Sequence, residues 1–455
     1  MRVLKFGGSS MENEETWVKV YQVIQSYDHP VVIVSATAET TKQLVTAAKL
    51  SLKDIDQANL LADQIKERHK LIIQNFFENS DIEASESIFN ESIKWIDTCI
   101  HSLKNDLYNI STSNELNPKT FDSIASLGEK LSSRLFTNCG KVFGLNTKWV
   151  DARKIIKTDS NFGNARPQFS LIKKAVAKNF YQFDENYAFV MGGYYGSDHH
   201  NNTTTLGFDG SDYSASLVGS ALDATAIEIW TNVNGIFSCD PLVVENAVPL
   251  RELSFSEATK LAHFGAKVLH PSTMNPAKQK NIPILVKNLF EPTHPGTTIQ
   301  RKAPIDNQVK AMTFLEDVKI ITLNSSHKKT DYEFIASVFK VLQKYHTMVK
   351  VVQTTDNSIS LVLETKQFDA DLIKSLEQFG PVSVKNNQSV ISLIGCRFKN
   401  ADISINSVLS AMQNIEIFFL NYNNKKKYLN IAISKNDLMP AINAIHCKLF
   451  EPMIV

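Results

Sequence analysis

A buried strand, a glycine turn, a helix and a second buried strand follow one another at the start of this chain. The first apolar run, "RVLKF" at residues 2–6, leads directly into "GGSS". Residues 13–27 then carry apolar side chains at helical spacing. "PVVIVSA" at 30–36 is a continuous apolar run, typical of a strand that is covered on both faces. This order is a βαβ unit with parallel strands, and it predicts a sheet with helices on its faces.

The following region continues the alternation of helices and strands. Residues 42–118 contain no glycine and are mostly helical by pattern, and a further helix is predicted over 120–140. Runs rich in β-branched and aromatic residues predict strands within 146–152, 186–196, 224–241 and 282–288. The fold class predicted for this part of the chain is α/β, an αβα sandwich with a mainly parallel sheet.

An internal repeat replaces this pattern after Pro295-Gly296. The order strand, helix, strand, strand, helix occurs once from residue 318 and again from residue 389, each copy roughly 70 residues long. A βαββαβ arrangement packs two helices on one face of an antiparallel sheet. The predicted domains are therefore 1–303, an α/β domain, followed by two α+β modules at 304–385 and 386–455.

Charge and cysteine content exclude several classes of protein. The chain has 48 basic and 47 acidic residues, a balance that gives no reason to expect nucleic acid or a membrane surface as a partner. No apolar run approaches the roughly 20 residues that span a bilayer, and the N-terminus has too few apolar residues for a signal peptide. The five cysteines form no C-x-x-C pair, which argues against a disulfide framework or a zinc site. A reducing cytoplasm is expected.

Two glycine-containing loops have the chemistry of phosphate binding. In "KFGGSS", Lys5 ends a buried strand, and two glycines let backbone N–H groups approach an anion closely. Alone, this motif is equally consistent with a tight turn beside a surface lysine. The second loop, residues 192–212, combines glycines, three threonines and Ser211-Asp212 before a helix, although Asp212 could simply cap that helix. Since both loops follow parallel strands, they are expected at one sheet edge, which favours a phosphoryl-transfer site.

Several motifs, in order and at similar spacing, resemble those of aspartate kinase. They are "KFGGSS", "SLGEKLSSRL", "TTTLGFDGSDYSA", "IWTNVNGIFSCDP" and the stretch at 252–288 that includes "FGAKVLHP". The resemblance covers essentially the whole chain and matches the monofunctional form with tandem C-terminal ACT modules. It implies an amino-acid-kinase fold that transfers the γ-phosphoryl group of ATP to the side-chain carboxylate of L-aspartate, giving 4-phospho-L-aspartate.

The resemblance also implies roles for individual residues. Lys5 and Asp212 would be catalytic, Lys5 by stabilising the transferred group. The substrate-binding residues would be Thr41, Glu129 and Ser211, with Glu129 facing the substrate ammonium. The nucleotide would be bordered by Lys5, Gly7, Gly8, Ser9, Thr231, Phe237, Asp240 and Lys267.

The chemistry agrees with the absence of a predicted general base. A side-chain carboxylate with a pKa of about 3.9 is already ionised at neutral pH, so the reaction needs charge neutralisation and in-line positioning instead. Mg²⁺ would be held mainly by the ATP phosphates, and no residue is predicted as a metal ligand. His270, in "FGAKVLHP", is interpreted as structural for the same reason.

The sequence departs from the family pattern at residues that should hold anions. Phe208 stands where the family has an arginine that grips a substrate carboxylate, and phenylalanine offers no charge-assisted hydrogen bond. Leu242 also replaces an arginine, and Glu39 replaces a glycine. Arg153 or Arg166 could compensate. Otherwise the chain phosphorylates another carboxylic acid, or it is a non-catalytic regulatory protein. The ACT-like modules imply a homodimer with lysine or threonine as effector.

Overall fold

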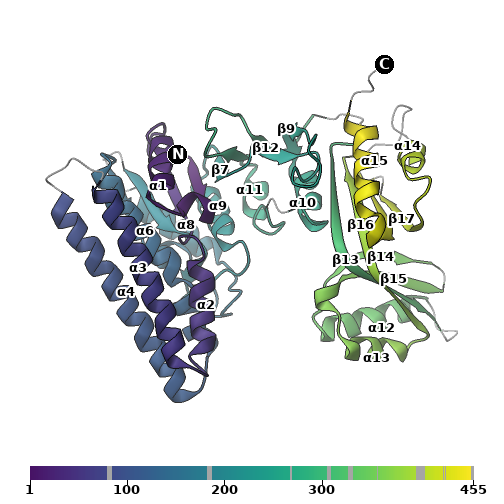
Figure 1. Ribbon diagram of the computed structural model, residues 1–455, viewed down its shortest axis with the longest axis horizontal. Coiled ribbons are helices and arrows are strands. Elements are labelled where there is room, and N and C mark those ends of the chain that lie inside the picture. Colours follow the sequence, from purple (N-terminus) through teal and green to yellow (C-terminus); the bar gives the residue numbers. More distant parts are fainter. Residues whose placement is uncertain are drawn as a thin grey trace. The chain divides into compact units, whose positions relative to one another are not determined.

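The computed structural model describes residues 1–78, 85–181, 187–266, 269–304, 309–325, 331–355, 357–395, 405–423, 425 and 427–451. The chain forms two compact units (Figure 1). The first consists of Met1–Ile236, Arg251–Phe255 and Leu269–Ala303, and the second of Phe237–Leu250, Ser256–Val268 and Pro304–Val455. Lys267 and Cys396 lie outside the described residues.

The first unit is built on an eight-stranded sheet in the order β10-β12-β11-β7-β1-β2-β4-β3. All neighbouring strands are parallel except β11 and β12. The strands are β1 (Val3–Phe6), β2 (Val31–Val34), β3 (Thr147–Trp149), β4 (Ala188–Gly192), β7 (Ile227–Thr231), β10 (Glu252–Ser254), β11 (Ile284–Asn288) and β12 (Thr297–Gln300). A separate hairpin pairs β5 (Tyr195–Ser197) with β6 (Thr203–Thr205). The predicted mainly parallel α/β fold is confirmed.

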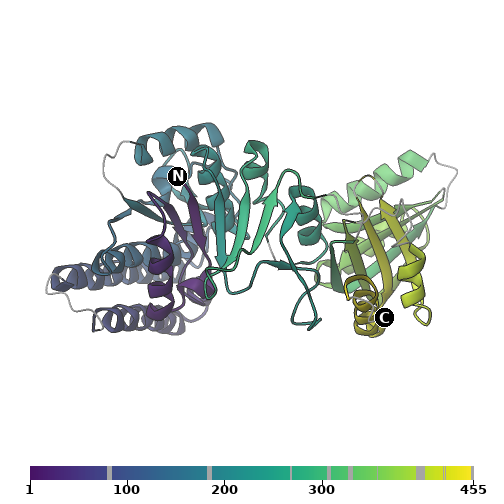
Figure 2. The same ribbon diagram turned by 90° about the horizontal axis from the view of Figure 1, so that it is seen from above.

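Helices cover both faces of this sheet (Figure 2). They are α1 (Glu14–Ile24), α2 (Thr40–Leu50), α3 (Ile55–Glu78), α4 (Ser85–Ser113), α5 (Pro118–Ala125), α6 (Leu127–Val142), α7 (Ala152–Ile155), α8 (Phe169–Phe180), α9 (Gly210–Ala221) and α11 (Asn275–Lys280), with a 3-10 turn η1 (Gly8–Met11). Side chains alternate along a strand. Leu4 and Phe6 therefore join the core formed with α1, α3, α4 and α6, whereas Val3 and Lys5 face α9.

The second unit contains a six-stranded antiparallel sheet in the order β14-β15-β13-β16-β18-β17. The strands are β13 (Ala311–Asn324), β14 (Val349–Thr354), β15 (Ser358–Glu364), β16 (Val382–Ile394), β17 (Ile417–Asn423) and β18 (Tyr428–Ser434). The helices are α10 (Phe255–His263), α12 (Asp331–Lys344), α13 (Ala370–Glu377), α14 (Ile405–Ala411) and α15 (Leu438–Phe450), with 3-10 turns η2 (Thr365–Gln367) and η3 (Lys435–Asp437). Two short strands, β8 (Ile236–Phe237) and β9 (Pro249–Leu250), pair with each other.

The predicted repeat is visible in this sheet as two hydrophobic cores. One core joins α12 and α13 to β13 and β15, and the other joins α14 and α15 to β16 and β18. The antiparallel sheet with its paired helices fits the ACT-like arrangement that the repeat predicts. One detail differs: the two strands expected at 381–386 and 389–396 are a single strand, β16, because it pairs with the long β13 over most of its length. The division at residues 303 and 385 stays a prediction.

Candidate active site

Lys5 and Asp212 form the centre of the site. Lys5 lies near the end of β1, between Ile33 of β2 and Ile229 of β7. Its Nζ lies 2.8 Å from Oδ1 of Asp212, in the first turn of α9, and both side chains are largely buried. Because α9 packs against β1, β2 and β7, its N-terminus meets the carboxyl ends of the central strands. Ligands bind at this edge in open α/β sheets.

The glycine turn after β1 is open on the side that faces away from the core. A Cβ at Gly7 would lie 3.5 Å from Lys5 Nζ, and a Cβ at Gly8 would meet nothing within 4 Å. Ser9 is exposed. The turn does not lead directly into a helix as predicted, because the 3-10 turn η1 comes first and α1 begins only at Glu14, behind a capping box made by Asn13 and Thr16. The N-terminus of α1 is therefore already satisfied by its own side chains.

The N-terminus of α9, in contrast, has no side-chain cap. Asp209 occupies the cap position with φ of 52°, and its side chain makes no capping hydrogen bond. The turn at the end of β4 approaches this helix so closely that a Cβ at Gly193 would lie 2.6 Å from Ser211 Cα, which only glycine permits. The uncapped N–H groups of α9 and the helix dipole therefore remain available to an anion beside Lys5.

Glu129 is the second charged group of the site, and it is buried in the first turn of α6. Burial raises the pKa of its carboxyl to about 8, against the opposing effects of the backbone N–H groups of Glu129 and Ala36 and of the Lys5 charge. Its Oε2 is buried and has no hydrogen-bond partner among the described residues. A buried carboxylate with an unsatisfied oxygen is suited to a cationic ligand such as an ammonium group.

The loop after β2 lies against Glu129. A Cβ at Gly128 would lie 2.8 Å from Ala36 Cβ and 3.4 Å from Thr41 Oγ1, so the predicted substrate residue Thr41 is brought next to Glu129 in space. Glu39 adopts φ of 62°, in the left-handed region that favours glycine. This conformation explains why a glycine is usual at this position in the family pattern.

The side chain of Phe208, at the position of the family's arginine, points into solvent. Its side chain is 82% exposed, and its ring contacts that of His270 edge-on at 6.2 Å. The neighbouring Asp209 has a raised pKa because its carboxyl is partly buried and lies near Asp212, although Lys5 and His270 oppose this shift. His270 Nδ1 lies 2.6 Å from Ser272 Oγ, and the structural role of His270 stays a prediction.

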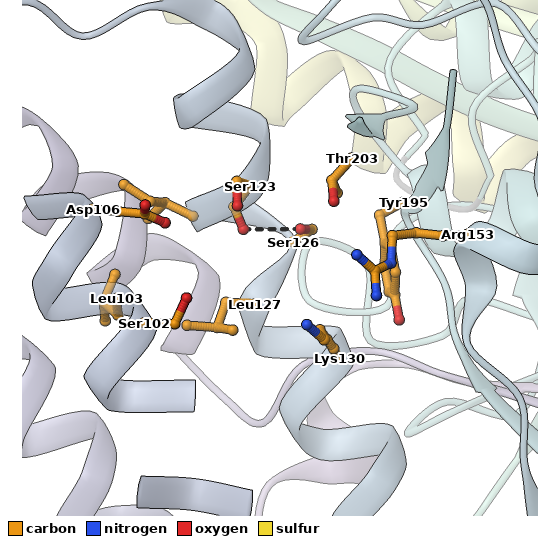
Figure 3. A pocket seen from close by; sticks show the side chains of 11 residues that line it. Ser102, Leu103, Asp106, Ser123, Ser126, Leu127, Lys130, Arg153, Tyr195 and Thr203 are labelled. Atoms are coloured by element: carbon orange, nitrogen blue, oxygen red, sulfur yellow. Dashed lines mark hydrogen bonds between the residues drawn. The ribbon is translucent and has the colours of Figure 1, made fainter. Parts of the chain in front are cut away.

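Arg153 already has a partner. Its Nε lies 3.1 Å from both carboxylate oxygens of Asp151. Arg153 and Lys130 line a cavity of about 60 Å³. Figure 3 shows Asp106 of α4 on the opposite side of this cavity from Arg153. Arg166 is exposed. Neither arginine is among the groups that influence the pKa of Glu129.

The predicted nucleotide residues fall into two groups. Thr231 ends β7, next to Trp230, which pairs with Phe6 at the end of β1. Phe237 and Asp240 belong to the second unit, where Asp240 Oδ1 accepts a hydrogen bond from the backbone N–H of Leu242. Leu242 is 94% exposed.

Sequence reasoning missed two residues that shape the site. Tyr194, with φ of 71°, donates its backbone N–H to Ser214 Oγ of α9 at 3.1 Å, and its position between glycines was a usable signal. Asp122 is buried and accepts hydrogen bonds from the backbone N–H groups of Gly163 and Thr205 and from the Thr205 hydroxyl. No local pattern marks Asp122, because its partners are distant in sequence.

The parallel sheet and the lysine, glycine and helix-terminus site define the class of protein. The sequence model of the amino acid kinase family matches residues 1–288, and the chain belongs to this family. Its relatives include aspartokinases, as the motifs predicted.

Two known proteins, one of them in two structural states, illustrate this likeness. The chain is 29% identical to the chloroplastic aspartokinase 3 of Arabidopsis thaliana, and the match covers 99% of this chain and 81% of that protein. The structure of E. coli aspartokinase III in complex with aspartate and ADP (R-state) matches with a TM-score of 0.86 at 27% identity, covering 99% of this chain and 100% of that one. The T-state of the same enzyme with lysine and aspartate has the same identity and coverage and a TM-score of 0.81.

Proposed function

We propose that the chain is an aspartate kinase that transfers the γ-phosphoryl group of ATP to the side-chain carboxylate of L-aspartate. The observation that carries this proposal is the Lys5–Asp212 pair, which sits between the open glycine turn and the uncapped N-terminus of α9. The E. coli relative, whose structure holds aspartate and ADP, supports the choice of substrates.

The nucleotide phosphates would lie along Gly7, Gly8 and Ser9 and the first turn of α9. Lys5 is held by Asp212 at the carboxyl edge of the sheet, so its ammonium is in place before the substrates bind. In the transition state, negative charge spreads over the transferred group, and a preorganised cation with backbone N–H groups stabilises that charge. Thr231, at the end of β7, is proposed to border the nucleotide.

The acceptor would be held by Glu129, Thr41 and Ser211. The unsatisfied oxygen of Glu129 would receive the substrate ammonium, which stabilises the ionised form of this buried carboxyl. The acceptor's own carboxylate is ionised at neutral pH and attacks phosphorus directly. No residue of the chain is needed as a base.

Mg²⁺ is proposed to enter with ATP, where it neutralises phosphate charge. Among the described residues, no group of three or more His, Cys, Asp or Glu side chains could hold a metal ion. The buried pair of Asp212 with Lys5 leaves that carboxylate engaged. We propose that the nucleotide phosphates supply most of the ligands of the ion.

The second unit is proposed to regulate the enzyme. Its two modules, 304–385 and 386–455, would bind lysine or threonine and join two copies into a homodimer, and the lysine complex of the E. coli relative supports the choice of effector. A cytoplasmic location is proposed as well. No described helix is long and apolar enough to cross a membrane.

An ADP-release assay with Mg-ATP and a panel of acids tests the proposal. Turnover with L-aspartate is expected, and the Lys5→Met variant should lose it while keeping a folded circular dichroism spectrum. Absence of ADP release with every acid would overturn the proposal.

The exposure of Phe208 favours a second candidate acceptor. Without a guanidinium at this position, the site would bind the α-carboxylate of aspartate weakly. An amino acid whose α-carboxylate is absent or esterified would be affected less by the missing arginine than aspartate is. β-Alanine and aspartate α-methyl ester therefore belong in the panel. Higher kcat/KM for either than for aspartate would identify the altered acceptor.

A further inference from the structure

Two adjacent residues of α3 contact the loop that carries Ala36 and leads to Thr41. The loop, residues 35–39, joins β2 to α2 and holds Ala36 against Glu129. Arg68 donates from Nη1 to the carbonyl oxygen of Ala38 at 2.7 Å and to Thr40 Oγ1 at 3.3 Å, and from Nη2 to Gln43 Oε1 at 2.6 Å. His69 reaches the same loop from the next position, through Thr37.

The hydrogen bonds around His69 have one consistent direction. Burial lowers its pKa to about 4, aided by Arg68 and opposed by the Ile65 carbonyl, so the ring is neutral at neutral pH. Nδ1 lies 2.7 Å from the carbonyl oxygen of Ile65 and must carry the proton. Nε2, 2.9 Å from Thr37 Oγ1, is therefore an acceptor.

The remaining directions follow from this assignment. Thr37 donates its hydroxyl proton to His69, so its oxygen accepts from Thr40 at 2.7 Å. Thr40, in turn, accepts from Arg68. His69, Thr37 and Thr40 are each at most 1% exposed, and every group in the chain of bonds has a partner. A fully satisfied buried network of this kind specifies one arrangement of the backbone that carries it.

We propose that Arg68 and His69 are positioning residues that hold the loop at 35–39 so that the backbone N–H of Ala36 faces the carboxylate of Glu129 and Thr41 stays beside Gly128. This inference rests on the proposed function for the identity of the acceptor. The hydrogen bonds given above for Arg68 and His69 go to residues 37–43 and to Ile65, so we expect their effect in the acceptor half of the site. The network also holds Thr40, the first residue of α2, against the strain of the left-handed Glu39 beside it.

The Thr37→Val variant tests the proposal because it removes the hydroxyl and keeps the shape of the side chain. The KM for the acceptor should rise about tenfold, which corresponds to one lost buried hydrogen bond, while the KM for ATP stays within about twofold of the wild type. Thr37→Ser restores the hydroxyl and should restore the acceptor KM. Arg68→Met should resemble Thr37→Val.

A matched control comes from the same helix. Lys66 of α3 pairs with Asp97 of α4 at 2.9 Å, away from the loop, so Lys66→Met loses an ion pair without affecting either KM. Equal increases in both KM values for Thr37→Val, or the same acceptor KM in Thr37→Val and wild type, would overturn the proposal.

Hydrogen–deuterium exchange separates this proposal from the proposed function. Amides of residues 35–41 should exchange faster in Thr37→Val than in Thr37→Ser, whether or not the wild type turns over aspartate. Unchanged exchange in these amides rejects the positioning role, whereas a wild type without turnover rejects only the kinase assignment.

Discussion

The ammonium of Lys5 and the carboxylate of Asp212 lie 2.8 Å apart, joining the end of β1 to the first turn of α9. The two residues are far apart in the sequence, and neither side chain is more than 14% exposed. It aims the lysine at the space between the glycine turn and the helix N-terminus.

Removing either partner should affect both turnover and stability. Lys5→Met should lower kcat about a hundredfold or more, because a preorganised cation is lost from the transition state. Asp212→Asn should lower the free energy of unfolding by about 3 kcal/mol, since it leaves a buried ammonium unpaired. Steady-state kinetics and urea titrations measure the two effects, and the double variant should regain most of the stability. Additive losses in the double variant would show that the pair is not energetically coupled.

Glu129 should make acceptor binding depend on pH. With a pKa of about 8, its carboxyl is mostly protonated at pH 6 to 7 in the free protein. A ligand ammonium binds the ionised form, so the affinity for aspartate should rise about tenfold per pH unit below pH 8 and then level off. Calorimetry at pH 7 in buffers of different ionisation enthalpy should detect the release of about one proton per aspartate.

The matched variant for this experiment is Glu129→Gln. It cannot titrate, so its aspartate affinity should be nearly independent of pH from 6 to 8. A slope equal to that of the wild type would assign the pH dependence to another group. The raised pKa also makes Glu129 contribute to the free energy of unfolding. This contribution is fully present below the ordinary glutamate pKa of 4.5 and is lost as the pH rises through about 8.

Phe208→Arg should tighten aspartate binding if the acceptor site lacks a guanidinium. The position is 82% exposed, so solvent screening reduces the gain to about tenfold in KM. Phe208→Leu, which changes the ring and adds no charge, should leave the KM for aspartate unaltered. If the arginine variant also leaves it unaltered, aspartate is held by other groups or is not the acceptor.

Glu39→Gly should stabilise the protein. A residue with a Cβ costs about 1 kcal/mol in the left-handed region, and Glu39 adopts φ of 62°. The exposed ion pair with Lys42 that would be lost contributes little. The midpoint of urea unfolding should therefore rise, while Glu39→Ala, which keeps the Cβ, should give no increase. A lower midpoint in the glycine variant would contradict the strain argument.

The hydrogen bond between Ser238 and His446 should stabilise the second unit. Ser238 Oγ lies 3.0 Å from His446 Nε2 of α15, and both side chains are fully buried. Ser238→Ala leaves the imidazole nitrogen without this partner, a change of about 1–3 kcal/mol in the free energy of unfolding. The midpoint temperature of thermal unfolding should therefore be lower in Ser238→Ala than in the wild type. Ser434→Ala, which removes only a partly exposed cap at η3, serves as the control and should shift the transition less.

Local sequence patterns were sufficient for much of the fold. Apolar alternation and helical spacing act between near neighbours, so β1, β2 and the two βαββα copies could be predicted without any tertiary information. The two glycine-containing loops could be placed at one sheet edge because parallel strands end there. The prediction of two separate strands where the structure has the single strand β16 was wrong, because β16 pairs with the distant strand β13 over most of its length.

The properties that make the site reactive come from contacts between residues far apart in the chain. Nothing near Glu129 in sequence indicates that its carboxyl is buried with one oxygen unsatisfied, because Ala36 and Lys5 approach it only in the folded protein. The same holds for the exposure of Phe208 and for the bond from His69 to Thr37. Residue types and their spacing thus dictated the strands, the turns and the kind of chemistry. Burial and long-range packing set the charges, pKa values and orientations, since these depend on neighbours that folding alone brings together.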